Sequence, residues 1–233
     1  MPVPDYKEAV AMCWTVRQRA EREARQRGSK DPGLRAGVTS GKHLDSLADL
    51  VEWVLVDAGL PEHAVHRGSA VELPGYFRPE KRWDVVAVHE NALVAAVEFK
   101  SILGSYGNNM NNRAEEALGN AEDLRQAAEA GLLGSVRPWT GYVFVMQDED
   151  ASRSPVGAKQ PHFSIDPVFV DSSYQDRAIA MCRRLMLKGL YDAAWFVTGD
   201  GTGKPDAIQE PAPDLTWAKF ETALRGRVAT LLA

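Results

Sequence analysis

Acidic and basic side chains lie at the ends of two apolar stretches of this chain. Asp84 precedes the first stretch, and Glu98, Phe99 and Lys100 end the second. Successive residues of a strand point to opposite faces, so Glu98 and Lys100 share one face while Phe99 turns into the core. If residues 89–92 form the turn of a hairpin, Asp84 lies within one residue of Glu98 across the strand pair. Two carboxylates and an ammonium group are therefore expected to converge.

These residue types fit the metal-assisted hydrolysis of a phosphodiester. The carboxylates of Asp84 and Glu98 and the carbonyl of Phe99 are hard oxygen ligands, which suit Mg²⁺. Such an ion lowers the pKa of a bound water and offsets charge that builds on the phosphate, and Lys100 would orient or help deprotonate that water. The alternative is that Glu98 and Lys100 form an ordinary exposed ion pair on an edge strand, because the spacing alone is degenerate.

Asp45 is a further candidate metal ligand. It falls in the first turn of a predicted helix. The helix dipole favours an acidic residue at that position, so helix capping alone is the other explanation.

Two polar segments beside the predicted active strand are candidates for DNA contact, because Asn and Arg hydrogen-bond to base edges and phosphates. The segment after the strand supplies Ser101, Asn108, Asn109, Asn111, Asn112 and Arg113. The segment before Asp84 supplies Arg78, Lys81 and Arg82. The alternative is a pair of ordinary surface loops, since Asn-rich turns tolerate left-handed backbone.

The elements expected to position these residues alternate in type. Apolar spacing predicts helices over residues 5–27, 41–58, 112–130, 174–188 and 216–232. Strands are predicted over residues 83–88, 93–100, 140–146 and 193–198. This order indicates an α/β fold with a central mixed β-sheet flanked by helices. We expect three regions: an N-terminal basic helix and loop (1–39), a core (40–198), and a loop with a C-terminal helix packed on that core (199–233).

The composition is that of a soluble globular protein, with 45% hydrophobic and 25% charged residues. The net charge of −5 argues mildly against a protein that coats nucleic acid. Residues 1–42 nevertheless hold nine Lys/Arg against five Asp/Glu. The first helix, with Arg22 and Arg25, is therefore either a phosphate-contacting arm or a solvated face.

No export signal or membrane span is expected, because the N-terminus has no apolar segment and no apolar run approaches about 18 residues. Cys13 and Cys182 fit no metal-ligand spacing and are interpreted as buried free thiols. A reducing, cytoplasmic setting is the expectation.

Five blocks of the sequence resemble, in order and spacing, the XhoI family of type II restriction endonucleases. The blocks are Leu-Pro-Gly-Tyr-Phe-Arg-Pro (73–79), Trp-Asp (83–84), Glu-Phe-Lys-Ser (98–101), Gly-Asn-Asn-Met-Asn-Asn-Arg (107–113) and Glu-Glu-Ala-Leu-Gly (115–119). The similarity extends from about Thr39 to the strand at Trp195. This family belongs to the PD-(D/E)XK nucleases; here Trp83 stands where that name has its proline.

The resemblance implies a restriction-endonuclease-like fold with a PD-(D/E)XK nuclease core over residues 40–198, and Asp84, Glu98 and Lys100 as Mg²⁺-dependent catalytic residues. It also implies a homodimer that cuts double-stranded DNA at the palindrome CTCGAG to leave 5′ overhangs, with a partner methyltransferase that protects the host. Two alternatives stay open: a repair or junction-resolving nuclease of the same fold, and a catalytically inactive DNA-binding protein.

Overall fold

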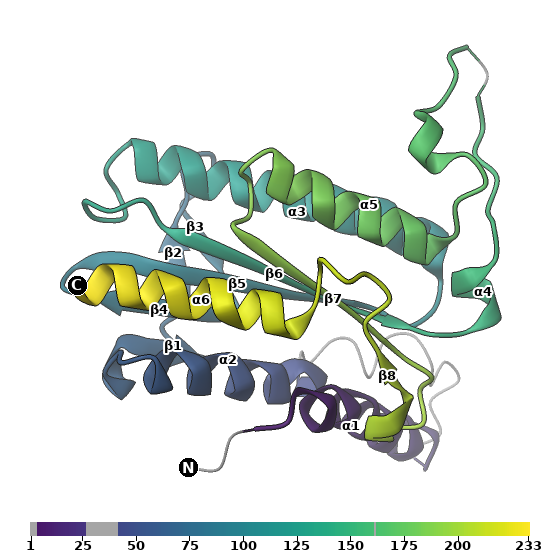
Figure 1. The fold of residues 1–233 in the computed structure, drawn as a ribbon, viewed down its shortest axis with the longest axis horizontal. Coiled ribbons are helices and arrows are strands. Elements are labelled where there is room, and N and C mark those ends of the chain that lie inside the picture. Colours follow the sequence, from purple (N-terminus) through teal and green to yellow (C-terminus); the bar gives the residue numbers. More distant parts are fainter. Residues whose placement is uncertain (1–3, 27–41, 161) are drawn as a thin grey trace.

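A six-stranded mixed β-sheet forms the centre of the protein (Figure 1). The structure is a computed structural model, and it describes residues 4–26, 42–160 and 162–233. The strand order is β1-β4-β5-β6-β7-β8, in which β5, β6 and β7 are parallel and the other neighbours are antiparallel. The strands are β1 Val65–Arg67, β4 Val85–His89, β5 Ala92–Ile102, β6 Trp139–Gln147, β7 Ala193–Gly199 and β8 Ile208–Gln209. A separate two-stranded sheet consists of β2 Glu72–Pro74 and β3 Glu80–Arg82.

Helices cover both faces of the central sheet, which confirms the predicted α/β architecture. One face packs against α1 Tyr6–Gln26, α2 Asp45–Asp57 and α6 Trp217–Leu232. The other face packs against α3 Tyr106–Glu129 and α5 Tyr174–Leu187, which lie above the sheet in Figure 1. The remaining elements are short: α4 Asp150–Arg153 and the 3₁₀ turns η1 Lys42–Leu44, η2 Glu62–Ala64, η3 Pro167–Phe169 and η4 Pro205–Ala207.

The hairpin of β4 and β5 sets the register of the candidate site. Val85 pairs with Val97, so Asp84 lies just before β4 and beside Glu98. The two-residue turn uses Glu90 and Asn91, both with positive φ, which matches the twist of a tight hairpin. The predicted hairpin and its register within one residue are therefore confirmed.

The first turns of α3 differ from the prediction. The helix begins at Tyr106 and includes the whole segment from Asn108 to Arg113, which was expected to be a loop before residue 112. Asn is a weak helix former, so its local preference argues against a helix here. Tyr106 and Met110, one turn apart, are both buried against the sheet, and this packing overrides the local preference.

Four short strands, β1, β2, β3 and β8, were not expected, because two or three residues are too few to show an alternating pattern. The expected loop over residues 28–39 and the helix start after Ser40 lie outside the described residues. The first helix packs Val10, Cys13 and Trp14 into the same apolar cluster as α2. Among the residues described, no helix is long and apolar enough to cross a membrane.

Candidate active site

Glu98 is a buried carboxylate surrounded by polar side chains, and only 1% of it is exposed. The Nζ atoms of Lys100 and Lys81 lie 2.6 Å and 3.3 Å from its Oε1. Asn120 Nδ2 donates to Oε1 at 2.8 Å and to Oε2 at 3.0 Å, and the Tyr191 hydroxyl donates to Oε2 at 3.1 Å. These partners come from β5, β3, α3 and the segment before β7, so four separate parts of the chain meet at this carboxylate.

The two lysines keep this buried carboxylate ionised. Burial alone would raise the pKa of Glu98, but the charges of Lys81 and Lys100, together with hydrogen bonds from Lys100 and Asn120, hold that pKa below its ordinary value. An ionised carboxylate in an apolar interior is stable only when it is paired and hydrogen-bonded, as Glu98 is.

Asp84 lies just before the first residue of β4. Its Oδ2 accepts a hydrogen bond from the Phe99 backbone N–H at 2.7 Å, and its own N–H donates to the Val97 carbonyl. Burial raises the pKa of Asp84, while the Phe99 N–H and the charge of Lys100 oppose that rise. The N–H and C=O of one strand residue point to the same side, so the Phe99 carbonyl also faces the Asp84 side.

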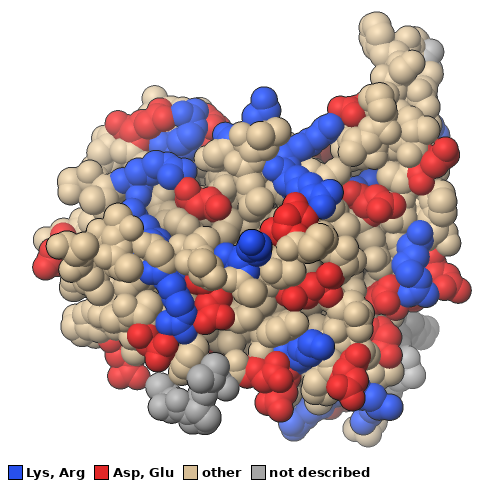
Figure 2. All heavy atoms as spheres, in the orientation of Figure 1, with Lys and Arg blue, Asp and Glu red and all other residues tan. Residues whose placement is uncertain are grey.

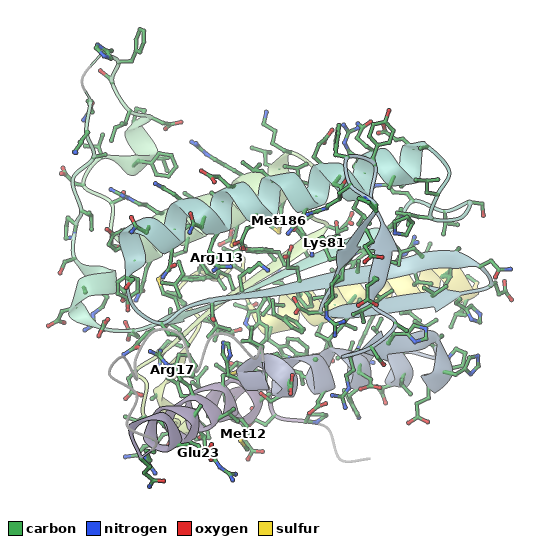
Figure 3. All side chains as sticks on the ribbon, turned by 180° about the vertical axis from the view of Figure 1, so that it is seen from behind. Met12, Arg17, Glu23, Lys81, Arg113 and Met186 are labelled. Carbon is green, nitrogen blue, oxygen red and sulfur yellow. The ribbon has the colours of Figure 1, made fainter. Side chains whose placement is uncertain are left out.

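The structure therefore brings together the predicted side chains on β4 and β5. Glu98 and Lys100 share the face that packs on α3, whereas Phe99 packs in the apolar cluster on the opposite face. Figure 3 shows Lys81 and Arg113 between α3 and the sheet, beside this position. Within the described ranges, no group of three Asp, Glu, His or Cys side chains is gathered as a metal site. The oxygen donors of Asp84, Glu98 and Phe99 nevertheless have the chemistry that a hard divalent cation prefers.

Asp45 faces the same cleft as Asp84. A cleft of about 340 Å³ is lined by both carboxylates, together with Arg67 and Arg82 among other residues. Asp45 is exposed in the first turn of α2, and Arg67 is paired with acidic side chains of that helix. The helical carboxylate suggested by the sequence thus lies on the Asp84 side of the site.

The basic residues before Asp84 have internal partners. Lys81, suggested as a DNA backbone contact, is only 11% exposed and lies between Glu98 and the Trp83 ring, 4.1 Å from the ring centroid. Arg78 donates to Asp123 Oδ2 at 2.7 Å and to Asn120 Oδ1 at 2.8 Å. Arg82 is more than half exposed and pairs with Glu72 at 2.5 Å. Lys81 is thus part of the site around Glu98, whereas Arg78 and Arg82 are exposed residues that are paired with acidic side chains.

The Asn/Arg segment lies along the first two turns of α3. Asn108, Asn111 and Asn112 are exposed, whereas Asn109 donates to the Gly104 carbonyl at 3.0 Å. These three exposed amides are available to a ligand on the solvent side of the helix.

Arg113 points toward the site and not toward solvent. Its Nη1 lies 2.5 Å from Glu116 Oε2, and Glu116 in turn lies 3.8 Å from the Nζ of Lys100. The buried Nε of Arg113 has no hydrogen-bond partner in the described parts of the chain. Ser101 is also engaged, because its Oγ lies 3.0 Å from Nε2 of the buried His43.

Three residues of this site were missed by reasoning from the sequence: Glu116, Asn120 and Tyr191. Asn120 follows Arg113 by two helical turns, so the face that carries Arg113 also carries it, and the correct helix start would have indicated this. Tyr191 is separated from Glu98 by 93 residues, and no local pattern connects the two.

The surface around α5 and α6 has no continuous basic area. Figure 2 shows Lys and Arg interspersed with Asp and Glu on that side of the molecule. The site around Glu98 lies instead beneath α3 and beside the β2–β3 sheet, which lie behind α5 and α6 in Figure 1.

A mixed sheet that carries Asp at the end of one strand and Glu-x-Lys on the next is the arrangement of the PD-(D/E)XK nucleases, of restriction-endonuclease-like fold. Residues 23–208 match the family "Restriction endonuclease XhoI". The chain belongs to the XhoI restriction endonuclease family.

Its relatives are named as type II restriction enzymes. The chain is 39% identical over 214 residues to type II restriction enzyme BstVI of Geobacillus stearothermophilus, covering 88% of this chain and 96% of the relative. It is 37% identical over 227 residues to type II restriction enzyme XhoI of Xanthomonas vasicola, covering 96% and 86%. It is also 39% identical over 160 residues to type II restriction enzyme AbrI of Azospirillum brasilense, covering 67% and 72%. No solved structure is significantly similar to the chain.

Proposed function

We propose that this chain is a Mg²⁺-dependent type II restriction endonuclease that makes double-strand cuts in DNA at a short palindrome. One observation carries the proposal, the convergence of two carboxylates and a lysine at β5. Lys100 Nζ lies 2.6 Å from Glu98 on the α3 face of this strand, and the Asp84 carboxylate accepts a hydrogen bond from the backbone N–H of Phe99, which lies between them in the sequence. A nuclease of this class needs two carboxylates and a lysine at one place, and the hairpin register supplies them.

Asp84, Glu98 and the Phe99 carbonyl would hold the cation, with Asp45 as a further carboxylate on the Asp84 side. When bound, the cation supplies Lewis-acid stabilisation of the phosphate and a more acidic water. Lys100 orients the attacking water and donates a hydrogen bond to it or to the scissile phosphate. Asn120 and Tyr191 fix the Glu98 carboxylate in one orientation, so little reorganisation is needed during the reaction.

The recognition sequence proposed is CTCGAG, cut to leave 5′ overhangs. The support is the resemblance of the five sequence blocks to the XhoI family. The exposed amides of Asn108, Asn111 and Asn112 are the candidates for base contact, because side-chain amides read adenine edges in the major groove. A partner methyltransferase that modifies the same sequence would protect the host.

We further propose that two copies act as a two-fold dimer. One active site per chain cuts one strand, and a palindrome carries the same two-fold symmetry as a dimer. Sedimentation with and without DNA tests this, and a monomer under both conditions would refute it.

Digestion of a plasmid with a single CTCGAG site tests the proposed function. Linear DNA with 5′ extensions, seen by sequencing the ends, is the expected product with Mg²⁺, and EDTA should prevent cutting. Nicked or branch-specific products would indicate a repair or junction-resolving nuclease. Binding without any cutting would indicate an inactive DNA-binding protein.

A further inference from the structure

Two exposed aromatic side chains form the tip of the β2–β3 hairpin. Tyr76 is 55% exposed and Phe77 is 70% exposed, and their rings meet edge to face with centroids 5.1 Å apart. Large aromatic side chains cover far more apolar area than most surface residues, so an exposed pair of them indicates a contact with another molecule.

The backbone of this tip is fixed by a single buried carboxylate. Asp123 Oδ1 accepts hydrogen bonds from the backbone N–H groups of Tyr76 and Phe77, both at 2.8 Å, and Oδ2 accepts from Arg78 at 2.7 Å. A Cβ atom on Gly75 would lie 2.7 Å from Asp123 Oδ2 and from the Arg78 carbonyl, so this close approach requires glycine. The backbone that carries the two rings is therefore held in place before any ligand binds, which lowers the entropic cost of binding.

Arg78, which binds Asp123 at the base of the tip, also contacts the candidate active site. Arg78 donates to Asn120 Oδ1 at 2.8 Å, and the amide of Asn120 donates to both oxygens of Glu98. Strand β3, which leaves the tip, also carries Lys81 to Glu98. The aromatic tip is thus connected to the Glu98 carboxylate through two side chains.

We propose that Tyr76 and Phe77 pack into a groove of the DNA beside the scissile phosphate, and that Arg78 and Asn120 couple this contact to the orientation of Glu98. The inference rests on the proposed nuclease function. It assigns DNA contact to an apolar tip on the side of the molecule where the substrate phosphate must reach Glu98. The partly exposed cation of Arg78 adjoins the tip and suits a polyanion, and Arg82 adds a second exposed cation at the far end of the same hairpin.

A second copy of the chain is the less suitable partner for this tip. Two aromatic side chains bury at most about 500 Å². A stable protein interface needs about 800 Å² from each partner. By contrast, many DNA-binding proteins insert a few apolar side chains between base steps of a duplex, and this contact needs only a small protein surface.

The double substitution Tyr76→Ala with Phe77→Ala tests the contact. Binding of a CTCGAG duplex, measured by fluorescence anisotropy in Ca²⁺ to suppress cutting, should weaken about tenfold, while the melting temperature stays unchanged. The exchanged pair Tyr76→Phe with Phe77→Tyr keeps both rings and should bind like the wild type. Phe163→Ala removes an exposed aromatic from the segment that protrudes between α4 and η3 in Figure 1, and should also bind like the wild type.

Unchanged affinity of the double alanine variant would overturn the proposed contact. Altered sedimentation with unchanged affinity would do so as well, and would assign the tip to an interface between copies. A wild-type protein that neither binds nor cuts the duplex would instead refute the proposed function, so the two failures are distinguishable.

Arg78→Lys tests the coupling. Lysine keeps the charge but lacks the planar fork that contacts Asp123 and Asn120 together. Duplex affinity should change less than twofold, whereas the single-turnover rate of cutting by the bound complex should fall roughly tenfold. A wild-type rate would show that the tip and Glu98 are independent.

Discussion

Neighbouring residues of β5 have opposite surroundings on the two faces of the sheet. On one face, Phe99 and Val97 lie in an apolar cluster with side chains of α2 and α6. On the other face, Glu98 is equally buried but has four polar partners. Burying a carboxylate costs several kcal/mol unless its partners compensate, so the second face is organised around a charge and the first around packing.

This difference separates the residues that determine chemistry from those that determine stability. A substitution on the Glu98 face should change cutting more than folding, and a substitution on the Phe99 face should do the reverse. The following predictions test that separation.

The largest effect is expected for Asp84→Ala, Glu98→Ala and Lys100→Ala. Each should lower the rate of cutting at least about a thousandfold, because positioned charges at the reacting phosphate supply several kcal/mol of transition-state stabilisation. Cleavage rates in Mg²⁺, with circular dichroism to verify folding, are the measurements. A folded variant that cuts at nearly the wild-type rate would refute the site.

Leu224→Ala on α6 should show the opposite pattern. Leu224 is fully buried in the cluster on the Phe99 face, so truncating it should lower the free energy of unfolding by roughly 3 kcal/mol. The rate of cutting at a temperature where the variant is folded should stay near wild type. Leu187→Ala, at a position that is 81% exposed, is the control and should change stability by less than about 0.5 kcal/mol. Loss of cutting in folded Leu224→Ala would show that the two faces are not separate.

The two faces also differ in how far the sequence predicts them. Alternation along β5 is a local signal. It correctly predicts that Glu98 and Lys100 share one face of the strand and that Phe99 points to the opposite face. Asn120 and Tyr191 reach Glu98 from 22 and 93 residues away, so only the fold brings them there.

Lys81 shows a different limit of sequence reasoning. A lysine between Glu80 and Arg82 has the pattern of a surface loop, and it was interpreted as a phosphate contact. The short pairing of β2 with β3 turns its side chain inward to Glu98. No feature of a three-residue strand indicates which way its middle residue points.

Two buried tyrosines allow a matched test of the polar face. Tyr191→Phe removes a hydroxyl that donates to Glu98 and should lower the rate of cutting roughly tenfold, since hydrogen bonds to charged groups are worth about 1.5–3 kcal/mol. Tyr142→Phe removes a buried hydroxyl that has no partner in the described ranges, so it should leave cutting unchanged and stability equal or slightly higher. Equal losses in both variants would mean that Tyr191 acts through packing and not through Glu98.

The smallest effect is expected for a substitution of Arg22, which lies on the exposed side of α1. This substitution tests whether DNA contact extends beyond the Glu98 face of the sheet. Arg22 is exposed, and Arg17, farther toward the start of the same helix, bonds to Gln147 at the end of β6. That contact brings α1 close to Tyr106, where α3 begins, because the Tyr106 hydroxyl donates to the Gln147 carbonyl. We therefore expect Arg22 to contact phosphate without reading sequence.

Arg22→Glu should weaken binding equally on a CTCGAG duplex and on a scrambled one, and should reduce the log–log salt slope by about one unit. Lys219→Glu makes the same charge change at an exposed position of α6, the helix in front of the sheet in Figure 1, and should leave the slope unchanged. An unchanged slope in Arg22→Glu would confine DNA contact to the side of α3 and the β2–β3 hairpin. Equal slope changes in both variants would show that binding responds to the net charge of the protein. A phosphate contact, by contrast, depends on the position of the charged side chain.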